Sequence, residues 1–413
     1  MPKTASVLII VENLTVPLDR RVWQEARTLR DAGHTVSVIC PVGGKYTQPY
    51  EVLEGIHVFR HPMLLEADGA LGYLIEYSWA LAWEFALSIK AHFKVGFDVV
   101  QACNPPDLLF VVAGFWKYLF GKRFVFDHHD LNPELYEAKF GKRGFFHKLL
   151  TVLERCTFKV ADASIATNDT FRQIAMERGG MNADQVFVVR SIPDVSRFKR
   201  IAPNTVLRNG KKHVIGYVGI MGAQDGVDLL VEAMDDIVNV QNRKDVGCVI
   251  VGSGTELTSL KALVSAKGLH DYVTFTGFLA GQSLLAALSS FDVGVIPDPK
   301  NTYNDKISMN KAFEYMTLGI PFVQFDLVEG RKIAGDAALY AADNSPQDLA
   351  RKIEQLCDDA DLAASLAAEG RMRAAALLRW EEEACQLLSA YDAVLRLDAV
   401  QEQSGSGMTL SRR

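Results

Sequence analysis

The residues of this chain that are best suited to chemistry gather in a few short stretches. In NDKISMNKAFEYMTLGIPFV (304–323), a single carboxylate, Glu314, lies within a helical and partly apolar run. Lys306 and Lys311 precede it, and Lys311 lies one helical turn before the glutamate. The pattern predicts a helix at the entrance of an active site, followed by a Gly-Ile-Pro stop and an apolar strand.

The segment DHHDLNPELY (127–136) offers two histidines between two aspartates. A histidine at the carboxyl end of a strand can transfer protons or act electrostatically beside a reacting centre. Because adjacent residues point to opposite faces of a strand, His128 and His129 cannot both face one cleft if the strand persists. The segment lacks a third ligand at a suitable spacing, so it predicts no metal site. A histidine that only forms hydrogen bonds within a loop is the alternative.

Two strand-to-helix turns, VGIMGAQDG and VGSGTEL, are rich in glycine. Gly219 and Gly222 in the first turn, and Gly252 and Gly254 in the second, let a ligand approach the backbone. Amides at a helix start favour phosphate or ribose oxygens, so the turns predict a diphosphate site. The second turn lacks the GxGxxG fingerprint, which disfavours a classical dinucleotide site. A tight turn without a ligand is the alternative.

Arg20 and Arg21 follow the first predicted strand, in PLDRRVWQEA, and begin the first predicted helix. Arginines at this place can clamp a phosphate or contact an acceptor. They can equally form salt bridges across a cleft, and the residues alone do not decide between the two.

Strand-like apolar runs alternate with helical patterns, which is typical of βαβ units and a parallel sheet. A length of 413 residues fits two such domains. The polar segment 199–212, which carries Pro and Gly and has no clear period, is the predicted linker. Predicted strands before the linker cover 6–12, 35–41, 57–62, 97–102, 122–130, 161–167 and 185–191. Predicted strands after it cover 214–219, 246–254, 272–278, 291–298, 320–326 and 337–342.

The composition excludes several classes of protein. Hydrophobic residues make up 49% and charged residues 23% of the chain, as expected for a well-buried globular protein. The formal charge of −6 argues against a nucleic-acid partner, which a basic excess would favour. Six scattered cysteines without a CxxC pair fit a reducing compartment. The short apolar run at the N-terminus and the lack of a long charge-free apolar stretch predict a cytoplasmic protein.

Two stretches have the composition of a membrane contact. YLIEYSWALAWEFALSIKAHFK (73–94) is rich in aromatic residues, and KFGKRGFFHKLL (139–150) interleaves Lys and Arg with Phe. Basic residues beside aromatic ones suit an anionic interface, so peripheral membrane contact is one interpretation. A buried helix and a solvated loop are the alternatives.

The order and spacing of these motifs resemble the retaining, nucleotide-sugar-dependent glycosyltransferases of family 4, glycosyl transferases group 1. VGIMGAQDGVDLLVEAM resembles the family's VGRL…KG…LLEA, and VIVGSGTELTSLK resembles its LVGDGPELEEL. FEYMTLGIPFV is similar to LEAMAAGxPVV, and HHDLNPE is similar to the HD element of the acceptor domain. RWEEEACQLLSAYDAVL is similar to the C-terminal helix, and the resemblance covers most of the chain.

The resemblance implies an α/β protein with the GT-B fold, in which two Rossmann-like domains face each other across a cleft. Residues 1–198 would form the acceptor domain, and residues 213–378 the nucleotide-sugar donor domain. A helix at 379–398 would return to the N-terminal domain, and residues 399–413 would form a disordered tail.

The implied reaction is the transfer of a hexose from a UDP- or GDP-sugar, with retention at the anomeric carbon and no obligatory metal or other cofactor. The acceptor would be a glycan or a polyprenyl-diphosphate-linked glycan in surface polysaccharide biosynthesis, of exopolysaccharide or lipopolysaccharide. The enzyme would then work in the cytoplasm, at the inner face of the membrane. A nucleotide-sugar epimerase of the same architecture and a non-catalytic GT-B partner protein are the alternatives.

The resemblance also implies roles for individual residues. Glu314 corresponds to the glutamate that holds the ribose hydroxyls, where a carboxylate makes charge-assisted hydrogen bonds. His129, which precedes Asp130, corresponds to the histidine near the transferred sugar. His129, Asp130 and Lys311 are the candidate catalytic residues. The two glycine-rich turns and Phe278, at the end of VTFTGF, fall in segments that bind the donor.

Two departures from the family pattern concern the donor diphosphate. Lys306 replaces the first glutamate of the family's pair, and Ile220 and Asp225 replace its phosphate-clamping arginine and lysine. Because buried phosphates without cations are costly, we hypothesise that Lys306 or Lys311 neutralises them. An arginine of the first predicted helix would contribute a further positive charge.

Overall fold

The computed structural model describes residues 4–63, 69–193, 198–342 and 344–407. Within helices, the side chains of residues 69–77 and 397–407 are not described. Contacts divide the chain into two compact units, and each is an α/β structure. The first unit comprises Met1–Pro133, Lys142–Ser191 and Glu381–Arg413, and the second comprises Glu134–Gly141 and Ile192–Trp380.

The first unit contains one eight-stranded sheet. Its strands are β1 (Ser6–Val11), β2 (Thr35–Pro41), β3 (Tyr50–Leu53), β4 (Ile56–His61), β5 (Val99–Cys103), β6 (Arg123–His128), β7 (Ala163–Ala166) and β8 (Val186–Val188). They are ordered β3-β4-β2-β1-β5-β6-β7-β8, and β3 alone pairs antiparallel. The sequence predicted seven of them and missed β3, because this short, half-exposed edge strand has no strong apolar pattern.

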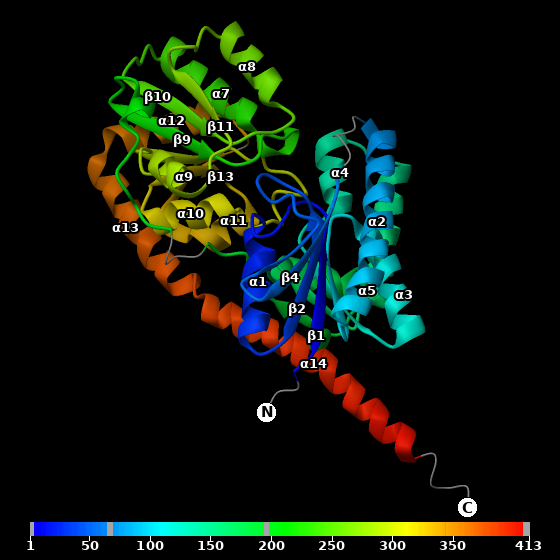
Figure 1. Cartoon of the computed structure of the whole chain (residues 1–413). Helices are drawn as coiled ribbons and strands as arrows, with labels where there is room; N and C mark the ends of the chain where they lie inside the picture. The colour runs from blue at the N-terminus through cyan, green and yellow to red at the C-terminus, as the bar shows by residue number, and fades with distance from the viewer. Residues whose placement is uncertain (1–3, 64–68, 194–197, 343, 408–413) are drawn as a thin grey trace, which may run out of the picture. The chain divides into compact units, whose positions relative to one another are not determined.

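Helices cover both faces of this sheet, which explains the near-continuous apolar runs of β1 and β5. Figure 1 shows α1 beside one face and α2, α3 and α5 beside the other. Along the chain, the helices between these strands are α1 (Arg20–Asp31), α2 (Gly69–Lys94), α3 (Phe110–Phe120), α4 (Asn132–Phe140), α5 (Phe145–Val160) and α6 (Asp169–Glu177). From Glu134 on, α4 belongs to the second unit.

The second unit contains a six-stranded, fully parallel sheet. Its strands are β9 (His213–Val218), β10 (Val246–Val251), β11 (Val273–Gly277), β12 (Val293–Ile296), β13 (Phe322–Phe325) and β14 (Ala338–Ala341). They are ordered β11-β10-β9-β12-β13-β14. The chain therefore reverses its direction of winding between β9 and β12, and ligands of open α/β sheets bind beyond the carboxyl ends of the strands at such a point.

Two buried clusters hold the second unit together, one on each face of the sheet. One cluster includes residues of α7, α8 and α12, and the other includes residues of α9, α10, α11 and α13. The helices are α7 (Val227–Asp235), α8 (Leu257–Ala266), α9 (Gly281–Leu288), α10 (Asn310–Leu318), α11 (Val328–Ala334), α12 (Pro346–Asp358) and α13 (Ala360–Leu377).

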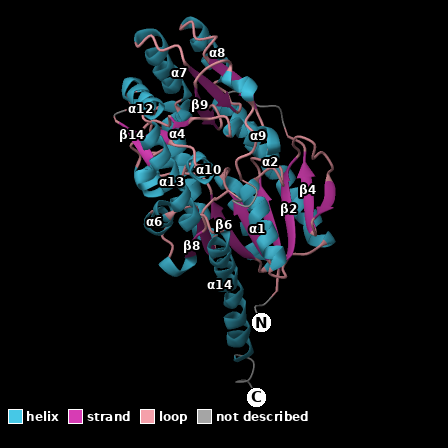
Figure 2. Ribbon diagram, turned by 90° about the vertical axis from the view of Figure 1, so that its left-hand side faces the viewer, coloured by secondary structure: helices cyan, strands magenta, loops and turns pink. Residues whose placement is uncertain are grey.

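The last helix, α14 (Trp380–Gly407), is the longest described helix of the chain and is drawn as one continuous helix in Figure 2. Its buried residues Leu387, Ala390, Tyr391 and Val394 recur at helical spacing and form the face that packs in the first unit. The helix extends to Gly407, where the sequence suggested a disordered tail from residue 399. Glutamine and glutamate in QEQ are good helix formers, and proline is absent from this segment. Residues 408–413 lie outside the described residues.

None of the described helices has a run of apolar residues that is long enough to cross a membrane. In α2, where the sequence suggested either a membrane contact or a buried helix, Leu87 and Ala91 are buried, whereas Phe93 and Trp79 are exposed.

One glutamate of α2 lies in the core of the first unit. Glu84 is fully buried, and among the described residues neither of its carboxyl oxygens has a hydrogen-bond partner. Burial, reinforced by the charge of Glu12, raises the pKa of Glu84 to about 8. The folded protein therefore holds this side chain in its neutral, protonated form at neutral pH.

We predict that Glu84→Gln flattens the pH dependence of stability. The unfolded glutamate releases its proton near its ordinary pKa of 4.5, whereas the folded one keeps it up to a pKa of about 8. Stability is therefore lost as the pH rises through this window, at up to ~1.4 kcal/mol per pH unit. Glutamine cannot ionise, so the variant should gain on the wild type between pH 5 and pH 8 in urea unfolding. The exposed Glu177→Gln of α6 is the control, and parallel curves for all three proteins would contradict the prediction.

Candidate active site

His129 follows β6 directly, at the carboxyl edge of the first sheet, and its ring nitrogen Nε2 has two partners. Asp127 Oδ2 lies 2.7 Å from it, and the Arg21 Nε–H donates to it at 3.0 Å. A protonated Nε2 donates to Asp127, whereas a neutral Nε2 accepts from Arg21. The site therefore offers His129 a bond in either protonation state. In the described part of the chain, Nδ1 has no hydrogen-bond partner.

Arg21 lies in the first turn of α1, where Asp19 accepts a hydrogen bond from the Val22 amide and caps the helix. Its guanidinium is buried and donates to Asp127 Oδ1 at 2.9 Å and to the Val189 carbonyl at 2.8 Å. It also lies 3.1 Å from Glu25, one turn later in α1. Arg21 thus forms salt bridges within the first unit, whereas the two roles that the sequence left open for it, a phosphate clamp and a salt bridge across a cleft, stay predictions. Arg20 is exposed.

The electrostatics of this cluster follow from burial and from the single arginine. Burial disfavours the ionised form of Asp127, but Arg21 and His129 hold the pKa of Asp127 well below its usual range. Burial lowers the pKa of His129, but the neighbouring Asp127 carboxylate outweighs this effect and raises it. Burial raises the pKa of Glu25 to about 8, although Arg21 opposes this shift. At neutral pH the cluster therefore favours a charged His129 beside a charged Asp127.

The structure adds a third potential metal ligand that the spacing of DHHD did not reveal. Atoms of Cys103, Asp127 and His129 lie within 4.8 Å of one another. However, burial and the nearby carboxylates raise the pKa of the Cys103 thiol well above its usual value, whereas a metal needs the thiolate. Arg21 already bonds both Asp127 and His129, so a cation would meet a fixed positive charge. This donor set therefore fits a metal ion poorly.

His128 and His129 separate as strand geometry requires. His128, the last residue of β6, is fully buried among the rings of Phe126, Phe158 and Phe171. Only His129 lies in the polar cluster.

Asn104 fixes the backbone after β6. Its Oδ1 accepts hydrogen bonds from the amides of His129 at 2.6 Å and Asp130 at 3.2 Å, and its Nδ2 donates to the Asp130 carbonyl at 2.7 Å. The sequence analysis did not select Asn104, Asp127 or Gln101. Their signal was present, because each is a polar residue in or directly after a buried strand.

In the second unit, the two glycine-rich turns pack backbone against backbone. A Cβ on Gly252 would lie 1.8 Å from the Gly219 carbonyl oxygen, and one on Gly254 would lie 2.4 Å from that of Met221. The amides of Gly219 and Met221 donate across this contact, to Val251 at 3.0 Å and to Ser253 at 2.9 Å. Close approach of the turns therefore requires the glycines and occupies amides that the sequence analysis assigned to a diphosphate.

Gly222 lies in the same turn, and its amide donates to Asp225 Oδ2 at 2.9 Å. Asp225 thus accepts a local bond at the place where the family pattern has a lysine. Binding of the nucleotide-sugar by the four glycines stays a prediction. The close packing of the two turns and the local bond to Asp225 already account for glycine at these positions.

Lys311 is buried in the first turn of α10 and lies 2.6 Å from Asp298, which follows β12. It also lies 4.9 Å from the centroid of the Tyr217 ring. Burial lowers the pKa of Lys311, but Asp298 and Asp225 outweigh this effect and raise it. Burial raises the pKa of Asp225 to about 6. The charge of Lys311 opposes this shift, and the charge of Asp298 adds to it. Lys311 is therefore a charged residue that already neutralises carboxylates of its own unit.

The other predicted donor residues lie in the same unit. Lys306 Nζ lies 2.8 Å from Glu134 Oε1, so it too has a carboxylate partner. Glu314 is buried in α10, one turn after Lys311. Phe278 directly follows β11 and is 71% exposed. Their binding roles stay predictions.

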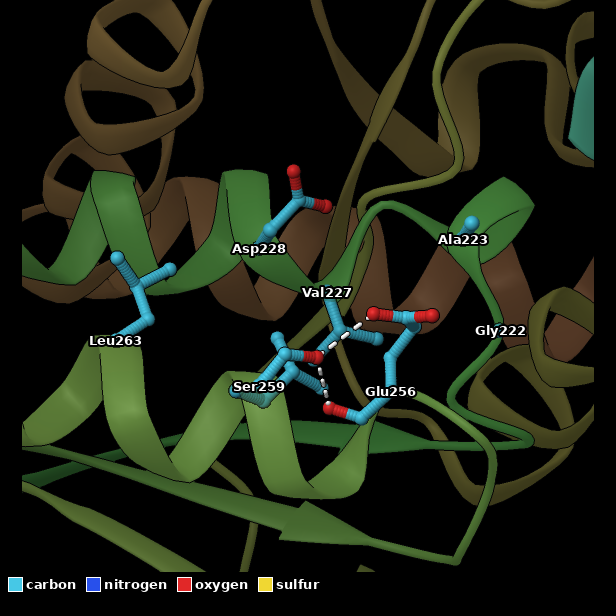
Figure 3. Close-up of a pocket in the computed structure, with 8 residues that line it drawn as sticks. Gly222, Ala223, Val227, Asp228, Glu256, Ser259 and Leu263 are labelled. Atoms are coloured by element: carbon cyan, nitrogen blue, oxygen red, sulfur yellow. Dashed lines mark hydrogen bonds between the residues drawn. The ribbon is translucent and has the colours of Figure 1, made fainter. Parts of the chain in front are cut away.

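A cavity of about 340 Å³ lies between the starts of α7 and α8. Figure 3 shows Gly222 and Ala223 on one side and Glu256 and Ser259 on the other. Ser259 Oγ donates to the Glu256 carboxylate and carbonyl, at 2.7 and 2.8 Å. With Asp228 also in its lining, the cavity carries two carboxylates and is unsuited to a diphosphate.

Comparisons with known proteins identify the class of this fold. A family model described as Glycosyltransferase Family 4 matches residues 18–197, and one described as Glycosyl transferases group 1 matches residues 212–359. Together the two matches span well over half of the chain. The protein belongs to the group 1, family 4 glycosyltransferases, as the sequence resemblance implied.

Individual relatives are distant. The 2-deoxystreptamine glucosyltransferase of Streptomyces kanamyceticus is 27% identical over 226 residues, which is 52% of this chain and 56% of the relative. The chain thus spans about half the length of this curated relative.

Solved structures confirm the GT-B fold. Sucrose-phosphate synthase from Thermosynechococcus elongatus superposes with a TM-score of 0.75 at 20% identity, over 96% of this chain and 99% of that one. Anabaena HepE, in complex with UDP-glucose, gives a TM-score of 0.71 at 17% identity, over 94% and 100% of the two chains.

We predict that Lys311→Met destabilises the protein by ~3–5 kcal/mol, because it leaves buried carboxylates without their cation. The loss should shrink between pH 8 and pH 5, because a buried carboxylate without a cation takes up a proton instead. Chemical denaturation at several pH values measures both effects.

Lys267→Met is the matched control, because Lys267 pairs with Glu232 and Asp235 at the surface of the same unit. It should change stability much less. Equal effects of the two substitutions would contradict the assignment of Lys311 to a buried ion pair.

Proposed function

We propose that this protein is a retaining hexosyltransferase that uses a UDP- or GDP-sugar without an obligatory metal. Its acceptor is a glycan or a polyprenyl-diphosphate-linked glycan in surface polysaccharide biosynthesis, at the inner face of the membrane. The observation that carries the proposal is the buried Arg21–Asp127–His129 cluster at the carboxyl edge of the first sheet, in a chain of this family.

The cluster suits sugar transfer because it fixes a histidine rather than a strong nucleophile. Asp127 and Arg21 hold Nε2 of His129, so an Nδ1–H is available to donate to an oxygen of the transferred sugar. Developing charge on the departing diphosphate needs fixed donors and cations, and the acceptor hydroxyl attacks on the face from which the diphosphate leaves. Asp130 follows His129, on the loop that Asn104 fixes.

Glu314 supports the donor half of the proposal. A buried carboxylate on α10, near the winding reversal of the second sheet, can accept both ribose hydroxyls. The UDP-glucose bound by HepE, a neighbour with the same fold, makes a UDP-sugar the first candidate. Lys306 and Lys311 remain the proposed cations for the diphosphate. Each ammonium group would then have to bond both the diphosphate and its present carboxylate partner.

We predict that a matching nucleoside diphosphate stabilises the protein. A ligand that binds only the folded state at 100 times its Kd adds ~2.7 kcal/mol, which a thermal-shift screen of UDP, GDP and their sugars detects. Glu314→Gln should abolish most of the shift, because it removes the charge that the ribose hydroxyls bond. The exposed Asp271→Asn in the same unit should leave the shift unchanged.

Incubation of the stabilising nucleotide-sugar with glycan acceptors, in the presence of EDTA, then tests the reaction. Proton NMR of the product should show the anomeric configuration of the donor. Conversion of the donor without an acceptor would instead indicate an epimerase. The absence of any nucleotide binding would indicate a non-catalytic protein, for which Ile220 and Asp225 would be the reason.

A lipid-linked acceptor requires contact with a membrane, and α5 carries a suitable surface. Between residues 142 and 159, the only acidic residue, Glu154, is buried. The exposed basic residues are Lys142, Arg143, Lys148, Arg155 and Lys159. The exposed apolar residues are Phe145, Phe146, Leu149 and Val152. In a chain of net charge −6, this concentration of positive charge beside exposed phenylalanines favours an anionic bilayer.

We predict that the protein floats with vesicles that contain phosphatidylglycerol and not with phosphatidylcholine alone, and that salt weakens the binding. Phe145→Ser and Lys148→Glu should each weaken it about tenfold, through lost apolar burial and lost charge attraction. Val206→Ser and Lys261→Glu, exposed residues of the second unit, are the matched controls. Equal binding of all four variants would overturn the membrane contact but not the transfer activity.

A further inference from the structure

A tyrosine of the C-terminal helix reaches the histidine cluster through one glutamine. Tyr391 of α14 is fully buried, and its hydroxyl donates to Oε1 of Gln101 in β5. The two residues are 290 positions apart in the sequence, and both belong to the first unit.

Gln101 is itself fully buried, and its amide nitrogen faces two carboxyl groups. Nε2 donates to Glu25 Oε2 at 2.8 Å and to Asp127 Oδ2 at 3.0 Å. With Tyr391 on the oxygen, both polar atoms of this amide have partners of the right kind. A polar residue in the middle of an otherwise apolar strand thus has a specific place in a network.

The Tyr391 hydroxyl fixes which way this amide points and how strongly it donates. Without the hydroxyl, Oε1 would be a buried acceptor with no donor, which is unfavourable. A flipped amide would bring its oxygen against the carboxylate of Asp127, which holds no proton to donate. A hydroxyl that donates to the amide oxygen also polarises the amide and strengthens its N–H donation.

Asp127 is the point at which this chain of bonds meets His129. Oδ2 of Asp127 accepts from Gln101 and lies 2.7 Å from Nε2 of His129, whereas Oδ1 accepts from Arg21. The donation from Gln101 therefore competes with His129 for the same oxygen. A weaker donation leaves more negative charge for His129.

We propose that Tyr391 is a positioning residue of the active site, which acts through Gln101 and Asp127 to set the orientation and protonation of His129. The proposal rests on the proposed function only for what His129 does to a substrate. The coupling between Tyr391 and His129 is a property of the folded chain and can be measured without turnover.

The test is Tyr391→Phe, which removes the hydroxyl and keeps the buried ring. NMR of isotope-labelled imidazoles, followed across pH, should show that the pKa of His129 rises, because Asp127 becomes less compensated. The charged groups that face His129 are Asp127, Arg21 and Glu25, and Glu25 titrates near pH 8. The titration should therefore be analysed with and without Glu25→Gln. A hexosyltransferase of the proposed kind should lose about tenfold in kcat with little change in the donor KM, as expected for a small misplacement.

Two further variants keep the result interpretable. Gln101→Met removes the whole connection and should move the His129 titration in the same direction and further. Tyr340→Phe removes a hydroxyl that donates to the Gly335 carbonyl in the second unit, and should leave the titration unchanged. Loss of thermal stability in Tyr391→Phe with an unchanged His129 titration would show a purely structural tyrosine and overturn the proposal. If the wild type transfers no sugar, the proposed function fails, and the NMR comparison still decides the coupling.

Discussion

The bond between the buried guanidinium of Arg21 and the buried carboxylate of Asp127 organises the site of the first unit. It joins the start of α1 to the end of β6, and an uncompensated charge at either end would be strongly destabilising. The neighbouring polar residues satisfy what this pair leaves open, since Glu25 faces the guanidinium and Gln101 faces the carboxylate. The side chain of His129 is therefore held in place by buried residues of the core, through Asp127 and Arg21.

The second unit also buries charged side chains, but there the carboxylates outnumber the cations. In the first unit one carboxylate, Asp127, is shared by an arginine and a histidine, whereas in the second one lysine, Lys311, faces Asp298 and Asp225. A diphosphate brought near this group would add negative charge where negative charge already prevails. The proton that Asp225 can take up, with a pKa raised to about 6, is one way to relieve this excess.

The sequence predicted the fold well because apolar periodicity determines which segments are buried strands. Every strand except β3 was predicted, and the GT-B class followed from the order of the motifs. The sequence placed Lys311 and Glu314 on one helix, with Lys306 ahead of it, and their roles in a site stay predictions. It did not show the carboxylate partners of the two lysines, Asp298 and Glu134, which come from other segments. Spacing along a chain shows which residues share a helix face, and it cannot show which long-range charge reaches that face.

The network that joins Tyr391, Gln101, Asp127 and His129 shows why long-range contacts cannot be predicted from separate segments of the sequence. Glu25, Gln101 and Tyr391 each look like a minor irregularity in an apolar pattern, and the structure shows that Gln101 bonds both of the others. The decisive test is a count of donors and acceptors, because a buried polar group is tolerated only when it is bonded. The oxygen of Gln101 accepts from one hydroxyl and its nitrogen donates to two carboxyl groups, so both polar atoms of the amide are bonded. A network that closes in this way over four separate segments specifies one arrangement of His129, and a substitution in the C-terminal helix can disturb chemistry at the end of β6.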